Sequence, residues 1–276
     1  MKTDCNLCPH HCSLEEGQTG LCRARANKGG EITCTNYGRI TSLALDPVEK
    51  KPLRRFYPGR WILSVGSYGC NLRCPFCQNC EISMKGDDSG TAFISPEELV
   101  EQAVELAGEP RGNIGVAFTY NEPLISFEYV RDCAELLQKA GLKTVLVTNG
   151  YICEEPLQKL LPFVDAMNID LKGFTPQYYE WLGGDLETVK RTVELSVKKC
   201  HVEVTTLVVP GKNDFVDEME DESSWLASLS PEIPLHISRF FPRFHMEDTS
   251  STPVETVYGL CRTAQKYLKY VYAGNC

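Results

Sequence analysis

The segment GCNLRCPFCQN, at residues 69–79, governs how the rest of the chain is interpreted. It places Cys70, Cys74 and Cys77 on one short loop, directly after a predicted apolar strand at residues 61–67. Three thiolates can bind three irons of a 4Fe–4S cube. The fourth iron then lacks a protein ligand, and a metal with an open position can bind a further molecule. The motif therefore predicts an iron–sulfur site with one open iron.

Predicted strands and helices alternate after this loop. The strands lie at residues 61–67, 114–119, 143–148, 165–171, 202–209 and 235–240, and residues 270–273 form a short last one. Such alternation indicates parallel βαβ units, in an open doubly wound sheet or in a full or partial (β/α) barrel of about six parallel strands. We divide the chain into a Cys-rich N-terminal metal-binding segment, 1–59, and a core, 60–276.

Polar residues follow several of these strands. They occur at residues 120–123, 148–150, 170–172 and 210–214. In both architectures ligands bind at the carboxyl ends of parallel strands. We therefore expect these polar groups to share one site with the cysteine loop, although each could also be a simple turn.

Four further cysteines precede the core, at positions 5, 8, 12 and 22. Four thiolates suit either structural zinc or a closed iron–sulfur cluster, and His10 and His11 are alternative zinc ligands. A metal would also explain how so polar a segment becomes ordered. We expect a second metal site here, zinc or Fe–S.

Composition limits the classes of function. Fourteen cysteines in 276 residues, without an apolar secretory run at residues 1–12, favour metal binding in a reducing cytoplasm over disulfides. The net charge of −9 argues against binding nucleic acid or acidic lipid, and no apolar run is long enough to span a membrane. We interpret the basic residues at 50–51 and 54–55 as a solvated face.

The cysteine spacing, with Phe76 just before the last cysteine, resembles the radical S-adenosylmethionine (SAM) superfamily. Nearly the whole chain resembles the AmmeMemoRadiSam-system radical SAM enzymes, which are similar to pyruvate formate-lyase activating enzymes. The motifs that carry this resemblance are CNLCPHHCSLEEGQTGLCRAR, YGRITSLALDPVEKKPL, FYPG, SVGSYGCNLRCPFCQN, FTYNEP, TNGY and NIDLKGF. It implies a radical SAM oxidoreductase with a barrel fold. Its cluster would cleave SAM to methionine and a 5′-deoxyadenosyl radical that abstracts hydrogen.

The resemblance also implies cofactor-binding residues. Asn121 and Glu122 match a motif that holds the SAM amino group, and Thr148 and Asn149 fall near its methionine or ribose. The remaining implied positions are Phe76, Asp170, Lys172 and His236. Asp170 and Lys172 could instead form a strand-end ion pair, and His236 could be a core histidine.

The resemblance leaves the substrate open: a glycine of a partner enzyme, another macromolecule or a small molecule. A low-potential donor such as ferredoxin or flavodoxin is expected to supply electrons. Cys80, where relatives carry Trp, could close the cluster, giving an iron–sulfur electron-transfer protein. A zinc-stabilised interaction protein is the other alternative.

Overall fold

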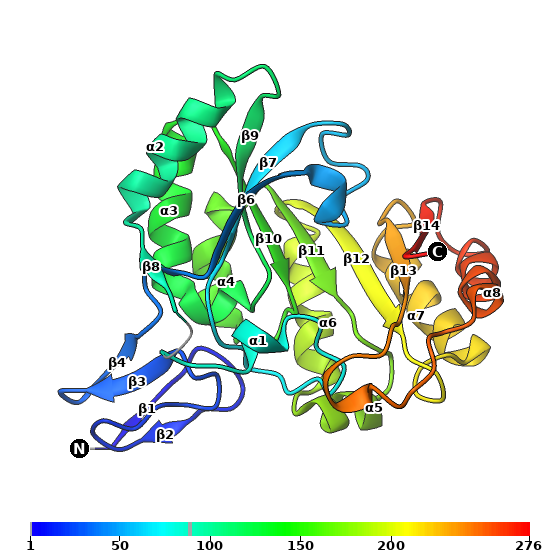
Figure 1. The fold of residues 1–276 in the computed structure, drawn as a ribbon. Coiled ribbons are helices and arrows are strands. Elements are labelled where there is room, and N and C mark those ends of the chain that lie inside the picture. The colour runs from blue at the N-terminus through cyan, green and yellow to red at the C-terminus, as the bar shows by residue number, and fades with distance from the viewer. Residues whose placement is uncertain (1, 88–89) are drawn as a thin grey trace.

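The computed structural model describes residues 2–87 and 90–276, and it is built around one eight-stranded sheet (Figure 1). The strand order is β14-β13-β12-β11-β10-β9-β7-β6, and all pairs are parallel except β6 with β7. The strands are β6 (Ser42–Pro47), β7 (Trp61–Gly66), β9 (Asn113–Phe118), β10 (Lys143–Thr148), β11 (Ala166–Asp170), β12 (His201–Val208), β13 (Leu235–Arg239) and β14 (Val271–Gly274). Among the described residues the pairing ends at β6 and β14, so the predicted barrel is confirmed in its partial form.

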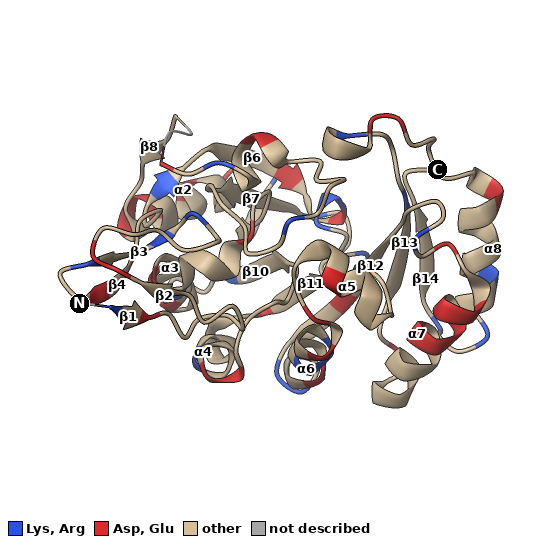
Figure 2. Ribbon diagram, turned by 90° about the horizontal axis from the view of Figure 1, so that it is seen from below, with Lys and Arg blue, Asp and Glu red and all other residues tan. Residues whose placement is uncertain are grey.

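Helices connect the parallel strands and cover the outside of the sheet (Figure 1). They are α1 (Cys80–Ser83), α2 (Pro96–Ala107), α3 (Phe127–Lys139), α4 (Glu154–Leu160), α5 (Pro176–Leu182), α6 (Leu186–Ser196), α7 (Val216–Leu229) and α8 (Val254–Ala264). Local signals explain several of their starts. Ser95 and Glu98 form a capping box at the start of α2, and acidic side chains occupy the first turn of α7 (Figure 2).

Three of the differences between the observed elements and the sequence prediction concern the barrel. The predicted helix at residues 124–140 is a 3₁₀ turn, Pro123–Ser126, followed by α3. Helix α5 was not predicted, because its seven residues are rich in aromatic side chains and end at Gly183. Strand β6 belongs to the central sheet, although residues 42–47 were assigned to the N-terminal segment.

The segment after β6 fills the interior of the barrel at the amino ends of the strands. Val48, Leu53 and Phe56 are buried there against apolar side chains of β7, β9, β10 and β11. The buried carboxylate of Glu203, on β12, accepts hydrogen bonds from the backbone N–H groups of residues 54 and 55 at 2.9 and 2.7 Å. This plug fills the amino end of the barrel, and the large polar cavity lies toward the carboxyl ends of the strands.

The N-terminal cysteines lie among short hairpins beside the barrel (Figure 1). The strands here are β1 (Thr3–Asp4), β2 (Ser13–Leu14), β3 (Arg25–Lys28), β4 (Glu31–Cys34), β5 (Arg39–Ile40) and β8 (Ala92–Phe93). Arg25 anchors this part to α3 through a two-armed ion pair with Glu128, with both N–O distances at 2.7 Å. Within the described residues, no helix has the length and apolar character needed to cross a membrane.

Candidate metal centre and cofactor cavity

The three-cysteine loop, Cys70 to Cys77, follows β7 and is fixed by contacts to other segments. Gly69 has a φ of 87°, and a side chain there would collide with the carbonyl oxygen of Cys22. Asn121, just beyond β9, accepts the N–H of Ser67 at 2.9 Å and donates to the carbonyl of Tyr68 at 3.1 Å. Its amide is thereby committed to holding the loop in place.

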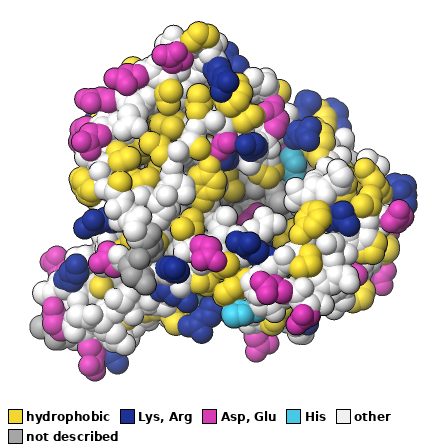
Figure 3. Space-filling model, viewed as in Figure 1, with side chains coloured by type: hydrophobic (Ala, Val, Ile, Leu, Met, Phe, Trp, Pro, Cys, Tyr) yellow, Lys and Arg dark blue, Asp and Glu magenta, His cyan; other side chains and the backbone are white. Residues whose placement is uncertain are grey.

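The loop lines a cavity of about 390 Å³ at the carboxyl ends of the strands. In the view of Figure 3 the molecule is hollowed near its centre. The cavity brings together most of the predicted site residues: Cys70, Cys74, Cys77, Phe76, Asn121, Glu122, Thr148, Asn149, Asp170 and Lys172. Residues from four separate parts of the sequence thus meet at the place where a barrel binds its ligand.

Burial raises the pKa of all three cysteine thiols in the loop. The pKa of Cys70 lies well above its ordinary value, and that of Cys74 rises to about 11. A cationic cluster would displace these protons, because thiolates are the ligands of iron. Three thiols on one loop facing a polar cavity fit a 4Fe–4S cluster with one iron open to a ligand.

Cys80 lies apart from this donor set. It is buried at the start of α1 and is absent from the cavity lining, although its neighbour Asn79 lines the cavity. The Cys80 Sγ lies 3.9 Å from a carboxylate oxygen of Glu81. The geometry therefore favours three cluster ligands over four.

Glu122 is a buried carboxylate at the end of β9. It accepts hydrogen bonds from the Thr148 hydroxyl at 2.6 Å and from the backbone N–H groups of Asn149 and Leu124 at 2.8 and 2.9 Å. Burial raises the pKa of Glu122 to about 7, against the effect of these hydrogen bonds. A carboxylate has about four acceptor sites, so one remains for a cationic group in the cavity.

Asn149 connects β10 to the cysteine loop. Its Nδ2 donates to the side-chain oxygen of Asn71 at 3.0 Å and lies 3.6 Å from the Cys70 Sγ. Asn71 in turn donates to the carbonyl of Tyr151 at 2.6 Å. The end of β10 therefore positions the first cysteine of the loop.

Asp170 and Lys172 form an ion pair with an N–O distance of 2.9 Å on the cavity wall after β11. Although burial opposes its charge, the Asp170 carboxylate holds the pKa of Lys172 well above its ordinary value. The ion-pair interpretation of these residues holds, and both also face the cavity. A cationic lysine beside the cysteine loop suits an anionic ligand group.

Phe76 packs beneath α5. Its ring centroid lies 5.7 Å from that of Trp181 and 6.5 Å from that of Tyr178. The ring is buried, so it fixes the cysteine loop against α5 and presents an apolar edge to the cavity.

His236 lies outside the cavity lining. Its Nε2 is 2.6 Å from a carboxylate oxygen of Glu203, and its ring stacks on Tyr272. Glu203 also contacts His201 at 2.9 Å. The structure places His236 in the polar layer beneath the cavity, where Glu203 holds the plug.

Sequence reasoning missed several residues that line the cavity. Lys50 comes from the plug, Thr205 and Ser238 from β12 and β13, and Asn275 from the chain end. The two-residue period of a strand could have identified Thr205 and Ser238 as inward-facing. Lys50 and Asn275 carry no local signal, because only the fold brings them to the cavity.

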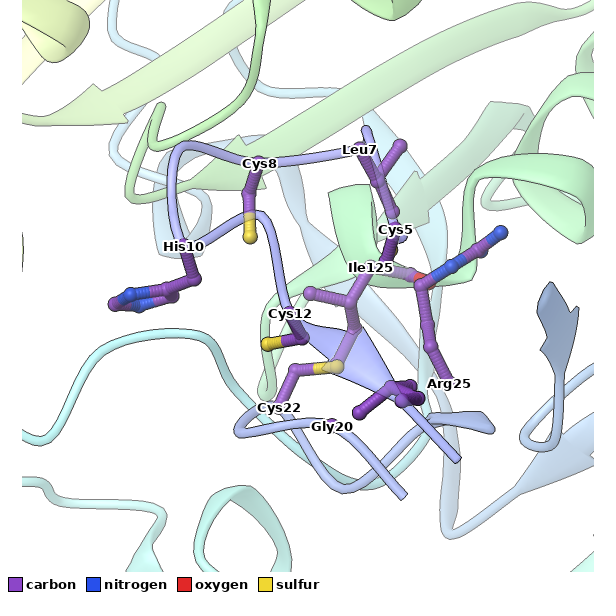
Figure 4. Close-up of a pocket in the computed structure, with 10 residues that line it drawn as sticks. Cys5, Leu7, Cys8, His10, Cys12, Gly20, Cys22, Arg25 and Ile125 are labelled. Carbon is purple, nitrogen blue, oxygen red and sulfur yellow. The ribbon is translucent and has the colours of Figure 1, made fainter. Parts of the chain in front are cut away.

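The four-cysteine site, formed by residues 5, 8, 12 and 22, surrounds a small apolar void (Figure 4). His10 points away from the void in Figure 4, and its Nε2 is 2.7 Å from the carbonyl oxygen of Asn71. His11 contacts Asn6 at 3.3 Å. The four thiols therefore line one void, while the ring nitrogens of both histidines contact other groups.

Comparisons with known proteins identify the family of this chain. The family model for the radical SAM superfamily matches residues 64–223. An uncharacterised protein of Methanocaldococcus jannaschii is 42% identical over 278 residues, which cover 99% of this chain and 81% of that protein. The pyruvate formate-lyase 1-activating enzyme of Escherichia coli is 28% identical over 151 residues, covering 53% of this chain and 60% of the enzyme.

A solved structure supports the fold. The radical SAM methyltransferase of Sphaerobacter thermophilus superposes with a TM-score of 0.60 at 16% identity, covering 79% of this chain and 67% of that one. This likeness concerns the fold alone. The family match and the Escherichia coli relative confirm the predicted relation to radical SAM activating enzymes.

Proposed function

We propose that this chain, an enzyme that belongs to the radical SAM superfamily, cleaves SAM reductively at a 4Fe–4S cluster on Cys70, Cys74 and Cys77. When bound, the cluster would supply the electron that converts SAM to methionine and a 5′-deoxyadenosyl radical, which abstracts hydrogen from a substrate. One observation carries the proposal: three thiols share a cavity with charged groups from the next strands, while Cys80 lies outside it.

The charges of the cavity match those of the amino-acid end of SAM. Glu122 has one acceptor site left for the SAM ammonium, and Lys172 offers a cation to the SAM carboxylate. Asp170 positions Lys172 through their ion pair. The two charges thus set the orientation of SAM relative to the cysteine loop.

Other residues position these groups or shape the cavity. Thr148 and Asn149 orient the Glu122 carboxylate, and Asn149 also reaches Cys70. Asn121 positions the three-cysteine loop through hydrogen bonds to the backbone of Ser67 and Tyr68. We assign His236 an indirect role: it contacts Glu203, the carboxylate that accepts hydrogen bonds from the plug backbone.

The proposal also includes the class of substrate. The relation to an activating enzyme supports a glycine of a partner enzyme as the site of hydrogen abstraction. We also propose a ferredoxin or flavodoxin as electron donor, a cytoplasmic location, and a division into a metal-binding segment and a radical SAM core. The boundary expected between residues 59 and 60 moves to the start of β6, because β6 and the plug belong to the barrel. The four-cysteine site is proposed as a second metal site.

Anaerobic assay of the reconstituted protein tests this function. With SAM and a chemical reductant, the protein should release 5′-deoxyadenosine and methionine. The Cys74→Ala variant should release none, and Cys200→Ala, which changes a cysteine remote from the cavity, should match the wild type. A reduced, cluster-loaded protein that makes no 5′-deoxyadenosine would refute the proposal.

A further inference from the structure

The four-cysteine site surrounds a small void of about 10 Å³. Cysteines 5, 8, 12 and 22 all line the same void, whose other walls include Leu7, Leu14 and Ile125. Figure 4 shows the side chains of Cys8, Cys12 and Cys22 reaching this space from different directions. Four thiolates without a histidine suit a closed iron–sulfur cluster as well as structural zinc, so the choice between them depends on what the site adjoins.

A chain of contacts joins this site to the three-cysteine loop. The backbone carbonyl oxygen of Asn71 lies 2.7 Å from the Nε2 of His10, two residues after Cys8. Asn71 follows Cys70 directly in the sequence, and its side-chain oxygen accepts from Asn149, whose Nδ2 also lies 3.6 Å from the Cys70 Sγ. Asn71 therefore contacts the loop that carries Cys8 and adjoins Cys70.

A second contact brings the two sites together at the backbone. The carbonyl of Cys22 lies so close to Gly69 that only glycine fits there. Ile125 lines the void of the four-cysteine site, and the neighbouring Leu124 donates its N–H to Glu122 in the cavity. The two cysteine sites are thus adjacent, with a single layer of residues between them.

We propose that the four-cysteine site holds a second, closed 4Fe–4S cluster, and that this cluster passes electrons to the three-cysteine site by way of Asn71. The inference rests on the proposed function, because it requires a cluster on the three-cysteine loop. A one-electron donor protein of the iron–sulfur or flavin class is oxidised by one electron, the second cluster is reduced, and the electron then moves to the first cluster. No bond forms or breaks in this transfer. Electron tunnelling falls steeply with distance, so adjacency of the sites is what the role requires.

Metal content tests the identity of the second site. The wild type should hold about eight irons and eight sulfides per chain after anaerobic reconstitution. A variant with Cys70, Cys74 and Cys77 all changed to alanine should keep about four irons and an EPR signal that does not respond to SAM. Zinc in place of iron in that triple variant would overturn the proposal, whether or not the wild type cleaves SAM.

Spectroscopy tests the adjacency. When both clusters of the wild type are reduced, their electron spins should couple, so the EPR spectrum should be broader than the sum of two isolated clusters. The triple variant supplies the spectrum of the second cluster alone. A Cys5→Ala/Cys8→Ala variant that keeps four irons supplies that of the first. A fully reduced wild type whose spectrum equals the sum would overturn the proposal.

A kinetic comparison tests the role of Asn71. In Asn71→Leu, the rate at which a donor protein reduces the first cluster should fall at least tenfold relative to the rate with a small chemical reductant that enters the cavity. Asn36→Leu is the control, because Asn36 is also buried and holds the carbonyl of Tyr68, off the path. Unchanged reduction by the donor protein in Asn71→Leu, with both clusters present, would exclude this route.

Discussion

The two cysteine sites differ in what surrounds their thiols. The three-cysteine loop faces a cavity with a carboxylate and an ammonium on its walls, whereas the four-cysteine site encloses an apolar void. A site with three ligands and polar neighbours can accept a charged molecule, and a site with four ligands and apolar neighbours cannot. The comparison shows how one chain can separate a reactive centre from a closed one within a short distance.

The largest expected effect is that SAM cleavage is lost when a cysteine of the three-cysteine loop is changed, but not when a cysteine of the four-cysteine site is changed. Cys74→Ala should lower the iron content by about half and abolish 5′-deoxyadenosine formation. Cys12→Ala should also lose about half of the iron but should keep SAM cleavage with a chemical reductant. Iron analysis and product assay on the same samples check both. The distinction between the sites would fail if Cys12→Ala also stopped cleavage while retaining the first cluster.

Removing the charge beneath the cavity should weaken the barrel that carries the three-cysteine loop. Burial opposes ionisation of Glu203, but hydrogen bonds from His201, His236 and the plug backbone hold its pKa at about 2. The folded-state pKa thus lies below the ordinary value for glutamate. The resulting stability is fully present above about pH 4.5 and is lost as the pH falls through about 2.

Glu203→Gln should therefore lower the free energy of unfolding at pH 5 by about 3 kcal/mol. Anaerobic urea titrations of both proteins at pH 5 measure this difference. Glu218→Gln is the control, because Glu218 is a less buried carboxylate with one backbone partner, Phe174. A difference near zero at pH 5 would show that these contacts do not hold Glu203 ionised.

Weakening the charge match in the cavity should lower the affinity for SAM. Glu122→Gln removes the negative charge that faces the SAM ammonium, which should cost about 2 kcal/mol, or about 30-fold in SAM affinity. Anaerobic calorimetry with the cluster-loaded protein measures the affinity. Glu218→Gln again serves as control. An unchanged SAM affinity in a variant with normal iron content would remove Glu122 from the binding site.

The smallest expected effect concerns the anchor of the four-cysteine site. Arg25→Lys cannot make the two-armed contact with Glu128, so the N-terminal segment should lose about 1–2 kcal/mol of local stability. In urea, the second site should release iron earlier than in the wild type, and the first site should not. Arg131→Lys, at a more exposed pair with Asp132, should have no such effect. Equal iron release from both sites would show that they unfold as one unit.

Much of the cavity could be predicted because its chemistry is local in sequence. The three cysteines lie on one loop, and Glu122, Thr148 and Asp170 each follow a recognisable strand. A parallel sheet brings such strand ends together, so their proximity follows from the fold class. The same reasoning could not place His236, because a histidine in a strand carries no sign of its partner 33 residues away.

The missed features depend on long-range contacts. Asn71 acquires its role from Tyr151 and Asn149, about 80 residues away in the sequence. Lys51 was interpreted as solvated, but it is buried in an ion pair with Asp46 at 2.9 Å. Composition cannot distinguish a paired lysine in a plug from one on the surface, since the difference lies entirely in the tertiary packing.

EPR of the reduced protein, with and without SAM, tests the central claim most directly. An open iron at the three-cysteine loop predicts that SAM alters the spectrum of that cluster and leaves the spectrum of the Cys70/Cys74/Cys77→Ala variant unchanged. A wild-type spectrum that SAM does not alter, with the cluster on the loop fully assembled, would contradict the claim and would point to a fourth protein ligand such as Cys80.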